Sequence, residues 1–154
     1  MYPTKGSKTV VSLLGTGVTN GATVTANIDT LGFDHVTVNV ITGTADVVSD
    51  TPSVLKFTEA DVTNATSFVA ITNLTGGTLA NTSGFFVLPN TDTSLTTVAN
   101  VFRFDIDTRA RKRYLQLAVS PRTTQQVVMV ATLDRAAETA GTTAAQGTHL
   151  TVNA

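Results

Sequence analysis

The sequence predicts an all-β protein, either a β-sandwich or a jelly-roll-like barrel of about eight to ten short strands. Many segments alternate apolar and polar residues with a period of two, which places successive side chains on opposite faces of a strand. Gly, Asn and Pro separate these segments at short intervals, as turns require. Thr and Val, which favour pleated strands, are abundant, whereas charged residues make up only 14% of the chain.

The first part of the chain contains several predicted strands separated by turn signals. The strands cover residues 9–14, 22–28 and 35–41. The glycine-rich segment 15–21 reads as a turn, and its Asn20-Gly21 pair is a strong signal because both residues tolerate positive φ. Gly32 allows a sharp bend before the strand at 35–41.

A further strand and one helical turn are expected in the middle of the chain. Residues 53–60 form the strand, with Leu55 and Phe57 facing inward. Residues 59–66 are the least strand-like interior segment, and we expect a single helical turn there with Thr58 as its N-cap.

A short strand at 68–71 precedes a long region, residues 72–100, that is rich in Thr, Asn and Gly. Only the apolar segment 85–88 interrupts it. A structureless connection of this length is uncommon in a compact domain, so part of it is expected to be a hairpin or a protruding loop. Protruding loops are where partners are often bound.

Two clear strand patterns flank the densest cluster of charge in the chain. The first pattern alternates apolar and charged residues, in the order Phe102, Arg103, Phe104, Asp105, Ile106 and Asp107. The second places Leu115, Leu117 and Val119 on one face. The basic run 109–113 lies between them, and the arrangement predicts a hairpin with a charged tip.

The best candidate for the middle of the core is the strand at residues 125–133. Its residues Val127, Met129, Ala131 and Leu133 alternate with Val128, Val130 and Thr132. Because both faces are apolar over its centre, this strand is expected in the middle of a sheet or between two packed layers.

The predicted organisation is one β-sandwich domain at residues 9–134 with a flexible arm at each end. The N-terminal arm is 1–8 and the C-terminal tail is 135–154, and neither has a core pattern. His149 to Val152 could add a strand to the edge of a neighbouring subunit. Without a signal-peptide pattern or an apolar stretch of membrane-spanning length, we expect the whole chain to be the mature protein, with no membrane contact.

Composition excludes or disfavours several classes of function. The chain has no Cys, which excludes disulfides, thiolate nucleophiles and the usual structural zinc sites. A net charge of −1 disfavours general nucleic-acid coats and polybasic membrane binders. Aromatic residues make up 6% and Trp is absent, which disfavours carbohydrate-binding modules with exposed aromatic platforms.

No catalytic, cofactor or metal site is predicted. His35 and His149 have no second ligand at metal-binding spacing, so a structural or solvent role is favoured for both. Asp105 and Asp107 share one face of a strand, as a pair of acids for hydrolysis or calcium binding would. We favour the simpler interpretation that they neutralise the basic run across the hairpin.

The basic run has two interpretations that the residues leave open. It is either an ordinary solvated turn or a docking site that presents Arg to carboxylates on an acidic protein surface. Duplex nucleic-acid binding is weaker, because no second basic patch accompanies the run. Together with the two arms, the run supplies the candidate protein-contact residues, which are Lys5, Lys8, Arg109, Arg111, Lys112, Arg113, His149, Leu150 and Val152.

Three segments carry a resemblance to a known family. They are VVSLLGTGVTNGATVTANIDTLGFDHVTVNV at 10–40, SVLKFTEAD at 53–61 and FRFDIDTRARKRYLQLAVSP at 102–121. They resemble small proteins found among the head genes of tailed bacteriophages, in which an IDTLG(F/Y)D segment and an (R/K)RYL segment before Thr-Pro or Ser-Pro recur. The resemblance spans most of residues 9–133 and points to capsid decoration, or cement, proteins.

The resemblance implies a non-enzymatic virion structural protein without a cofactor. Such a protein would be made in the host cytoplasm and would bind the outside of the major capsid protein lattice as a homo-oligomer, a dimer or a trimer. The alternative is an adhesion module on the virion surface that binds host glycan or protein through the region 72–100. A glycan hydrolase that uses Asp105 and Asp107 is a more distant third hypothesis.

Overall fold

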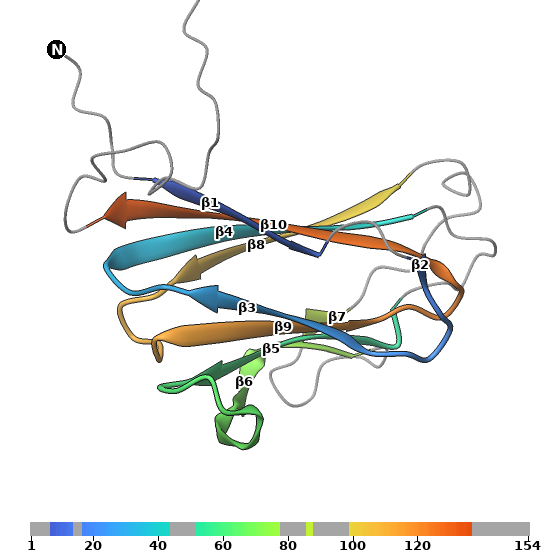
Figure 1. The fold of residues 1–154 in the computed structure, drawn as a ribbon, viewed down its shortest axis with the longest axis horizontal. Helices are drawn as coiled ribbons and strands as arrows, with labels where there is room; N and C mark the ends of the chain where they lie inside the picture. The colour runs from blue at the N-terminus through green and yellow to red at the C-terminus, as the bar shows by residue number, and fades with distance from the viewer. Residues whose placement is uncertain (1–6, 14–16, 44–51, 78–85, 88–98, 137–154) are drawn as a thin grey trace, which may run out of the picture.

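Two sheets pack face to face as a β-sandwich, which confirms the predicted fold class (Figure 1). The structure is a computed structural model that describes residues 7–13, 17–43, 52–77, 86–87 and 99–136. The sheets remain separate and do not close into a barrel. In this part of the chain no helix is long and apolar enough to span a bilayer.

The first sheet has the strand order β1, β10, β4 and β8, with β2 paired to the start of β10. Its strands are β1 (Lys8–Leu13), β2 (Gly17–Val18), β4 (Phe33–Thr42), β8 (Asn100–Asp107) and β10 (Gln125–Ala136). All pairs in this sheet are antiparallel. The strand predicted for the middle of the core, β10, is confirmed between β1 and β4.

The second sheet has the strand order β3, β9, β5, β6 and β7. Its strands are β3 (Val24–Asp29), β5 (Val54–Ala60), β6 (Val69–Gly77), β7 (Phe86–Val87) and β9 (Tyr114–Ser120). The short β7 runs parallel to β6, and the other pairs are antiparallel. Every strand predicted between residues 9 and 133 therefore overlaps an observed strand.

Two connections cross from one sheet to the other at the same end of the sandwich. One joins β3 to β4 and the other joins β8 to β9 (Figure 1). The predicted hairpin between β8 and β9 is therefore wrong, because β8 pairs with β4 while β9 pairs with β3 and β5. A period-two pattern on both sides of a short connection is compatible with a hairpin within one sheet and also with a connection between two sheets.

The predicted bend at Gly32 is confirmed in the connection between β3 and β4. Gly32 has a φ of +82°, which is unfavourable for residues that carry a Cβ atom. The turn is closed by a hydrogen bond of 3.0 Å from the Phe33 backbone N–H to the Thr30 carbonyl oxygen. This turn places the start of β4 above the end of β3, in the opposite sheet.

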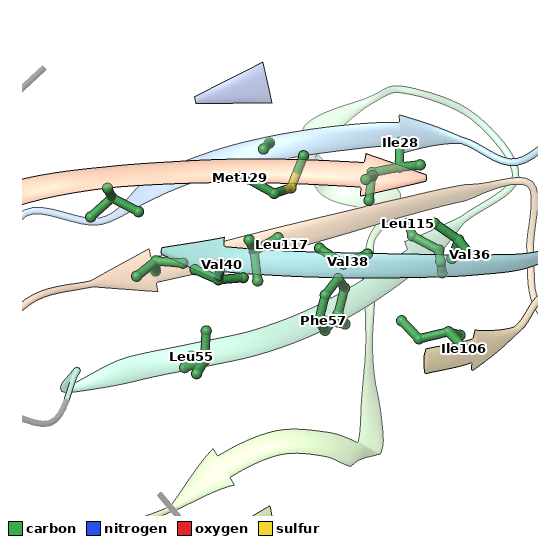
Figure 2. Packing of buried hydrophobic residues seen from close by; sticks show 14 of the residues in the cluster. Ile28, Val36, Val38, Val40, Leu55, Phe57, Ile106, Leu115, Leu117 and Met129 are labelled. Carbon is green, nitrogen blue, oxygen red and sulfur yellow. The ribbon is translucent and has the colours of Figure 1, made fainter. Parts of the chain in front are cut away.

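The core fills the space between the sheets, where side chains of both sheets gather (Figure 2). Phe57 of β5 is fully buried, and its ring meets that of Phe104 edge to face at 5.1 Å. Phe86 of β7 extends this contact, with its ring 5.4 Å from that of Phe104. The largest fully buried side chains are Phe57, Ile28, Leu55, Leu115, Leu117, Met129, Leu133, Val36, Val38, Val40, Val119 and Val127.

The helical turn predicted at 59–66 is shifted toward the C-terminus. A single 3₁₀ turn, η1 (Ala65–Ser67), is capped by Asn64, whose side-chain oxygen accepts from the Thr66 backbone N–H at 3.3 Å. The prediction of Thr58 as N-cap is wrong, because Thr58 lies inside β5 and its hydroxyl donates to the Gln116 carbonyl oxygen. Pairing with β9 thus took precedence over local capping.

Strands also occur in the region 72–100, where a hairpin or a protruding loop was expected, and in the segment 15–21, which was expected to be a turn. Residues 72–77 extend β6, because Thr75 pairs with Lys56 of β5. Within the glycine-rich segment, Gly17 and Val18 pair with the start of β10. Both differences arise from pairing with a neighbouring strand, which local composition does not encode.

Candidate functional site

The predicted basic run forms a connection that we call the basic arch, residues 108–113. It leaves β8 in the first sheet and enters β9 in the second. The Asp107 carboxylate accepts from the Arg109 backbone N–H at 3.0 Å, and the Thr108 carbonyl oxygen accepts from the Arg111 N–H at 3.0 Å. Two successive tight turns therefore carry the chain across the end of the sandwich.

Buried threonines join the basic arch to the connection between β3 and β4. Thr30 donates to the Arg113 carbonyl oxygen twice, from its N–H at 3.0 Å and from its hydroxyl at 2.7 Å. In return, the Thr108 backbone N–H donates to the Asp34 carbonyl oxygen at 3.0 Å, and the Thr108 hydroxyl donates to the Phe33 carbonyl oxygen. Both threonine side chains are buried, and each hydroxyl donates a hydrogen bond to the other connection. The two connections are therefore held together as one unit.

Arg113 and Asp29 form a bidentate ion pair beside this unit. The Nε–Oδ1 distance is 2.9 Å and the Nη2–Oδ2 distance is 2.8 Å. The Arg113 hydrogen bonds hold the pKa of the Asp29 carboxyl below its usual value, with smaller contributions from the Leu31 N–H and the charge of Lys8. The Arg113 guanidinium also lies 4.8 Å from the centre of the Tyr114 ring, within cation–π range.

The second sheet supplies the partners of the other two central cations. Arg111 Nη1 lies 3.7 Å from Glu59 Oε1, and the Lys112 backbone N–H donates to Glu59 Oε2 at 3.2 Å. Lys112 Nζ lies 3.7 Å from Asp61 Oδ2. The Glu59 side chain is only 18% exposed, whereas that of Asp61 is 74% exposed, so Glu59 is the partner that holds the arch.

Arg109 is the most exposed cation of the basic arch. Its guanidinium binds the Asp107 carboxylate, and this hydrogen bonding raises the pKa of Arg109. With 63% of its side chain exposed, Arg109 still presents part of its guanidinium to the surroundings. It is therefore the arch residue best placed to contact another molecule.

The four cations of the basic arch are thus matched by an equal number of carboxylates within the described residues. The four cations Arg109, Arg111, Lys112 and Arg113 face the four carboxylates Asp107, Glu59, Asp61 and Asp29. The interpretation that Asp105 and Asp107 together neutralise the run is half correct. Asp107 does so, whereas Asp105 binds Arg103 of its own strand at 3.1 Å.

Asp105 lies in a setting that favours its ionised form. Hydrogen bonds from Arg103, and then from the Thr37 hydroxyl at 2.8 Å, hold the pKa of Asp105 below its usual value. A general acid of a glycosidase needs a raised carboxyl pKa. The environment of Asp105 instead favours the ionised carboxylate.

The fold gathers the described contact candidates at one end of the sandwich. Lys8 begins β1 and pairs with Leu133 of β10, close to the end of that strand. In the same sheet His35 pairs with Asp107, directly before the basic arch, and with Asp134 of β10. We call this the arch end. Lys5, His149, Leu150 and Val152 lie outside the described residues.

Within the described ranges, no group of three or more His, Asp and Glu side chains is arranged to hold a metal ion. The acidic partners Asp29, Glu59 and Asp61 were not singled out by the sequence. A signal exists in hindsight, since each lies at or just beyond the end of a predicted strand, where a connection can meet it. The sequence does not say which connection.

Comparisons with protein-family models and with curated proteins find no match. Among solved structures, the chain is similar to part of one described as the crystal structure of BuGH86wt in complex with neoagarooctaose, with a TM-score of 0.41 and 10% identity. The match covers 82% of this chain and 19% of that chain, so this chain spans less than a fifth of its length. A likeness at this TM-score carries no conclusion about family or function.

Proposed function

We propose that the protein is a non-enzymatic virion structural protein that decorates a bacteriophage capsid and stabilises it from outside. Its partner would be the lattice of the major capsid protein. The proposal is supported by the resemblance of residues 9–133 to phage head proteins, together with the arrangement of the arch end.

The observation that carries the proposal is the meeting of three chain regions at the arch end. β1 starts there at Lys8, β10 ends there at Ala136, and the basic arch crosses there between the sheets (Figure 1). The first residue of β1 and the last residue of β10 therefore lie at the end of the sandwich that carries the exposed Arg109. Three regions that are distant in sequence can thus contact one partner surface.

This arrangement suits attachment to a repeated lattice. Terminal segments can add strands or peptide contacts to a partner beside the contacts that the sandwich itself makes. Individually modest contacts are sufficient when many copies bind a lattice, because linked sites increase the effective affinity. An exposed Arg fork adds charge-assisted recognition of carboxylates on that surface.

The experiment measures cosedimentation of the purified protein with shells of the major capsid protein that lack it. We expect saturable binding and an increased resistance of the shells to heat. Deletion of residues 137–154 and the substitution Arg109→Glu should each weaken binding. Arg122→Glu is the matched control, since Arg122 is exposed in the connection from β9 to β10, at the opposite end, and gives the same charge change.

Two outcomes would overturn the proposal. One is a lack of binding to the shells, and the other is equal heat resistance of shells with and without the protein. Binding to host glycans or to a host surface protein, without binding to shells, would instead support the adhesion module. Equal weakening by Arg109→Glu and Arg122→Glu would show that net charge, rather than the arch end, governs attachment.

A further inference from the structure

β8 is an edge strand of the first sheet in the part of the chain that the structure describes. It pairs with β4 over its whole length, from His35 opposite Asp107 to Thr42 opposite Asn100, without a bulge. In the described part of the sheet no strand pairs with its other edge. β8 contains neither Pro nor Gly, and its inward residues Phe102, Phe104 and Ile106 carry no charge.

The other described edges are protected or short. β1 begins with Lys8 and has an irregular register between Val11 and Leu13, both of which are devices that discourage edge pairing. β3 lies beside β1 of the opposite sheet. β7 has only two residues, which pair with Gly76 and Gly77, and the rest of β6 pairs irregularly with β5 between Lys56 and Thr58. β8 is therefore the edge best suited to pair with another strand.

The inner face of β8 is incompletely covered. Phe102 and Phe104 point toward the core, but both are only partly buried, unlike the residues opposite them on β4. Phe104 contacts Phe57 and Phe86 on one side. A strand added beside β8 would bury the remaining aromatic surface, which is the favourable term in association.

The charges of β8 are self-complementary about Phe104. In an antiparallel pair of two β8 strands centred on Phe104, Arg103 of one copy faces Asp105 of the second copy, and the reverse pair forms by symmetry. On the inner face, Phe102 faces Ile106 of the second copy. Opposite charges therefore face each other on the outer face, and apolar residues face each other on the inner face, at the positions on either side of Phe104. Beyond them, Val101 faces Asp107 of the second copy.

We propose that two copies of the chain pair through β8, antiparallel and centred on Phe104, to form one continuous sheet across a two-fold axis. The combined sheet would then have the strand order β1, β10, β4 and β8 in one copy, followed by β8, β4, β10 and β1 of the second copy. The contact uses only residues of this chain. The substitutions that test it, at Arg103 and Asp105, leave the four cations of the basic arch unchanged, so the test is independent of capsid attachment.

The test is a charge reversal with rescue, read by sedimentation velocity over a range of concentrations. Arg103→Glu alone and Asp105→Arg alone each place like charges opposite each other in both pairs, and we expect dimer dissociation constants at least about tenfold higher. The double variant with both substitutions restores opposite charges and should dimerise like the original protein. Arg122→Glu should dimerise normally.

Circular dichroism establishes that each variant retains its strands, and the double variant guards against a simple loss of folding. A protein that stays monomeric at all concentrations would overturn the proposal. So would a dimer that neither single reversal weakens, a double variant that is not rescued, or a trimer, since edge pairing across a two-fold axis closes at two copies.

Discussion

The Arg113 guanidinium and the Asp29 carboxylate form two parallel hydrogen bonds, although 84 positions separate them in the sequence. Arg113 directly precedes the first residue of β9, and Asp29 is the last residue of β3, which pairs with β9. The same Arg113 offers its carbonyl oxygen to Thr30. One residue thus links the basic arch, the β3–β4 connection and the edge of the second sheet.

The Asp29 ion pair predicts a pH-dependent contribution to stability. Because the pKa of Asp29 is lowered in the folded protein, the contribution is present above its usual value of 3.8 and is lost as the pH falls through the folded value. Asp29→Asn should therefore lower the free energy of unfolding at pH 7 by on the order of 0.5 kcal/mol, after allowance for solvent screening. The difference should vanish in urea titrations near pH 2.

Asp61→Asn is the control for this prediction. Asp61 also faces a cation, but it is 74% exposed and lies 3.7 Å from Lys112. We expect little change in unfolding free energy at either pH. An Asp29→Asn difference that persists unchanged at low pH would contradict the linkage.

Arg111 and Lys112 are adjacent cations that should differ in their effect on folding. Arg111→Glu places a second carboxylate against the mostly buried Glu59, and should lower the free energy of unfolding by about 1 kcal/mol. Lys112→Glu places a carboxylate near the exposed Asp61 instead, and should lower the free energy of unfolding by clearly less than Arg111→Glu does. Equal midpoints for the two variants in urea titrations would refute the role of Glu59 as the partner that holds the arch.

Gly32→Ala tests the sharp turn between the sheets. No atom lies within 4 Å of the position a Cβ would take, so the only penalty is the positive φ. We expect the free energy of unfolding to fall by about 1 kcal/mol, as measured by thermal or chemical unfolding. Gly17→Ala, at a position without a positive φ and with its nearest neighbour at 4.0 Å, should have a smaller effect.

Phe57 should be the most sensitive core position on β5. Phe57→Ala removes a fully buried ring and its contact with Phe104, at a cost of about 3–5 kcal/mol. Phe57→Leu keeps most of the volume and should cost less than half of that. Urea unfolding of both variants checks the prediction, which fails if they are equally stable.

The candidate site was only partly predictable. The basic run was recognised because four cations within five positions need no structural context to be noticed. Its carboxylate partners were not, because Glu59 and Asp29 meet the arch only after β3, β5 and β9 have paired. From the sequence, Asp105 was expected to neutralise the basic run. In the structure its carboxylate binds Arg103, which lies on the same face of β8.

Most of the strands, and the side chains in them that face the core, follow from the alternation of the sequence alone. Val36, Val38 and Val40 are buried as their alternation predicts, and so are Leu55 and Phe57. These properties depend on a period of two, which is local and survives in any strand arrangement.

The neighbours of each strand depend on how the whole chain folds. A hairpin and an arch between sheets bury the same faces of β8 and β9, so the alternation cannot distinguish them. The choice rests on the pairing of β8 with β4 and of β9 with β3 and β5, over long separations in the sequence. That choice brought both chain flanks and the basic arch to one end, and left β8 at an open edge.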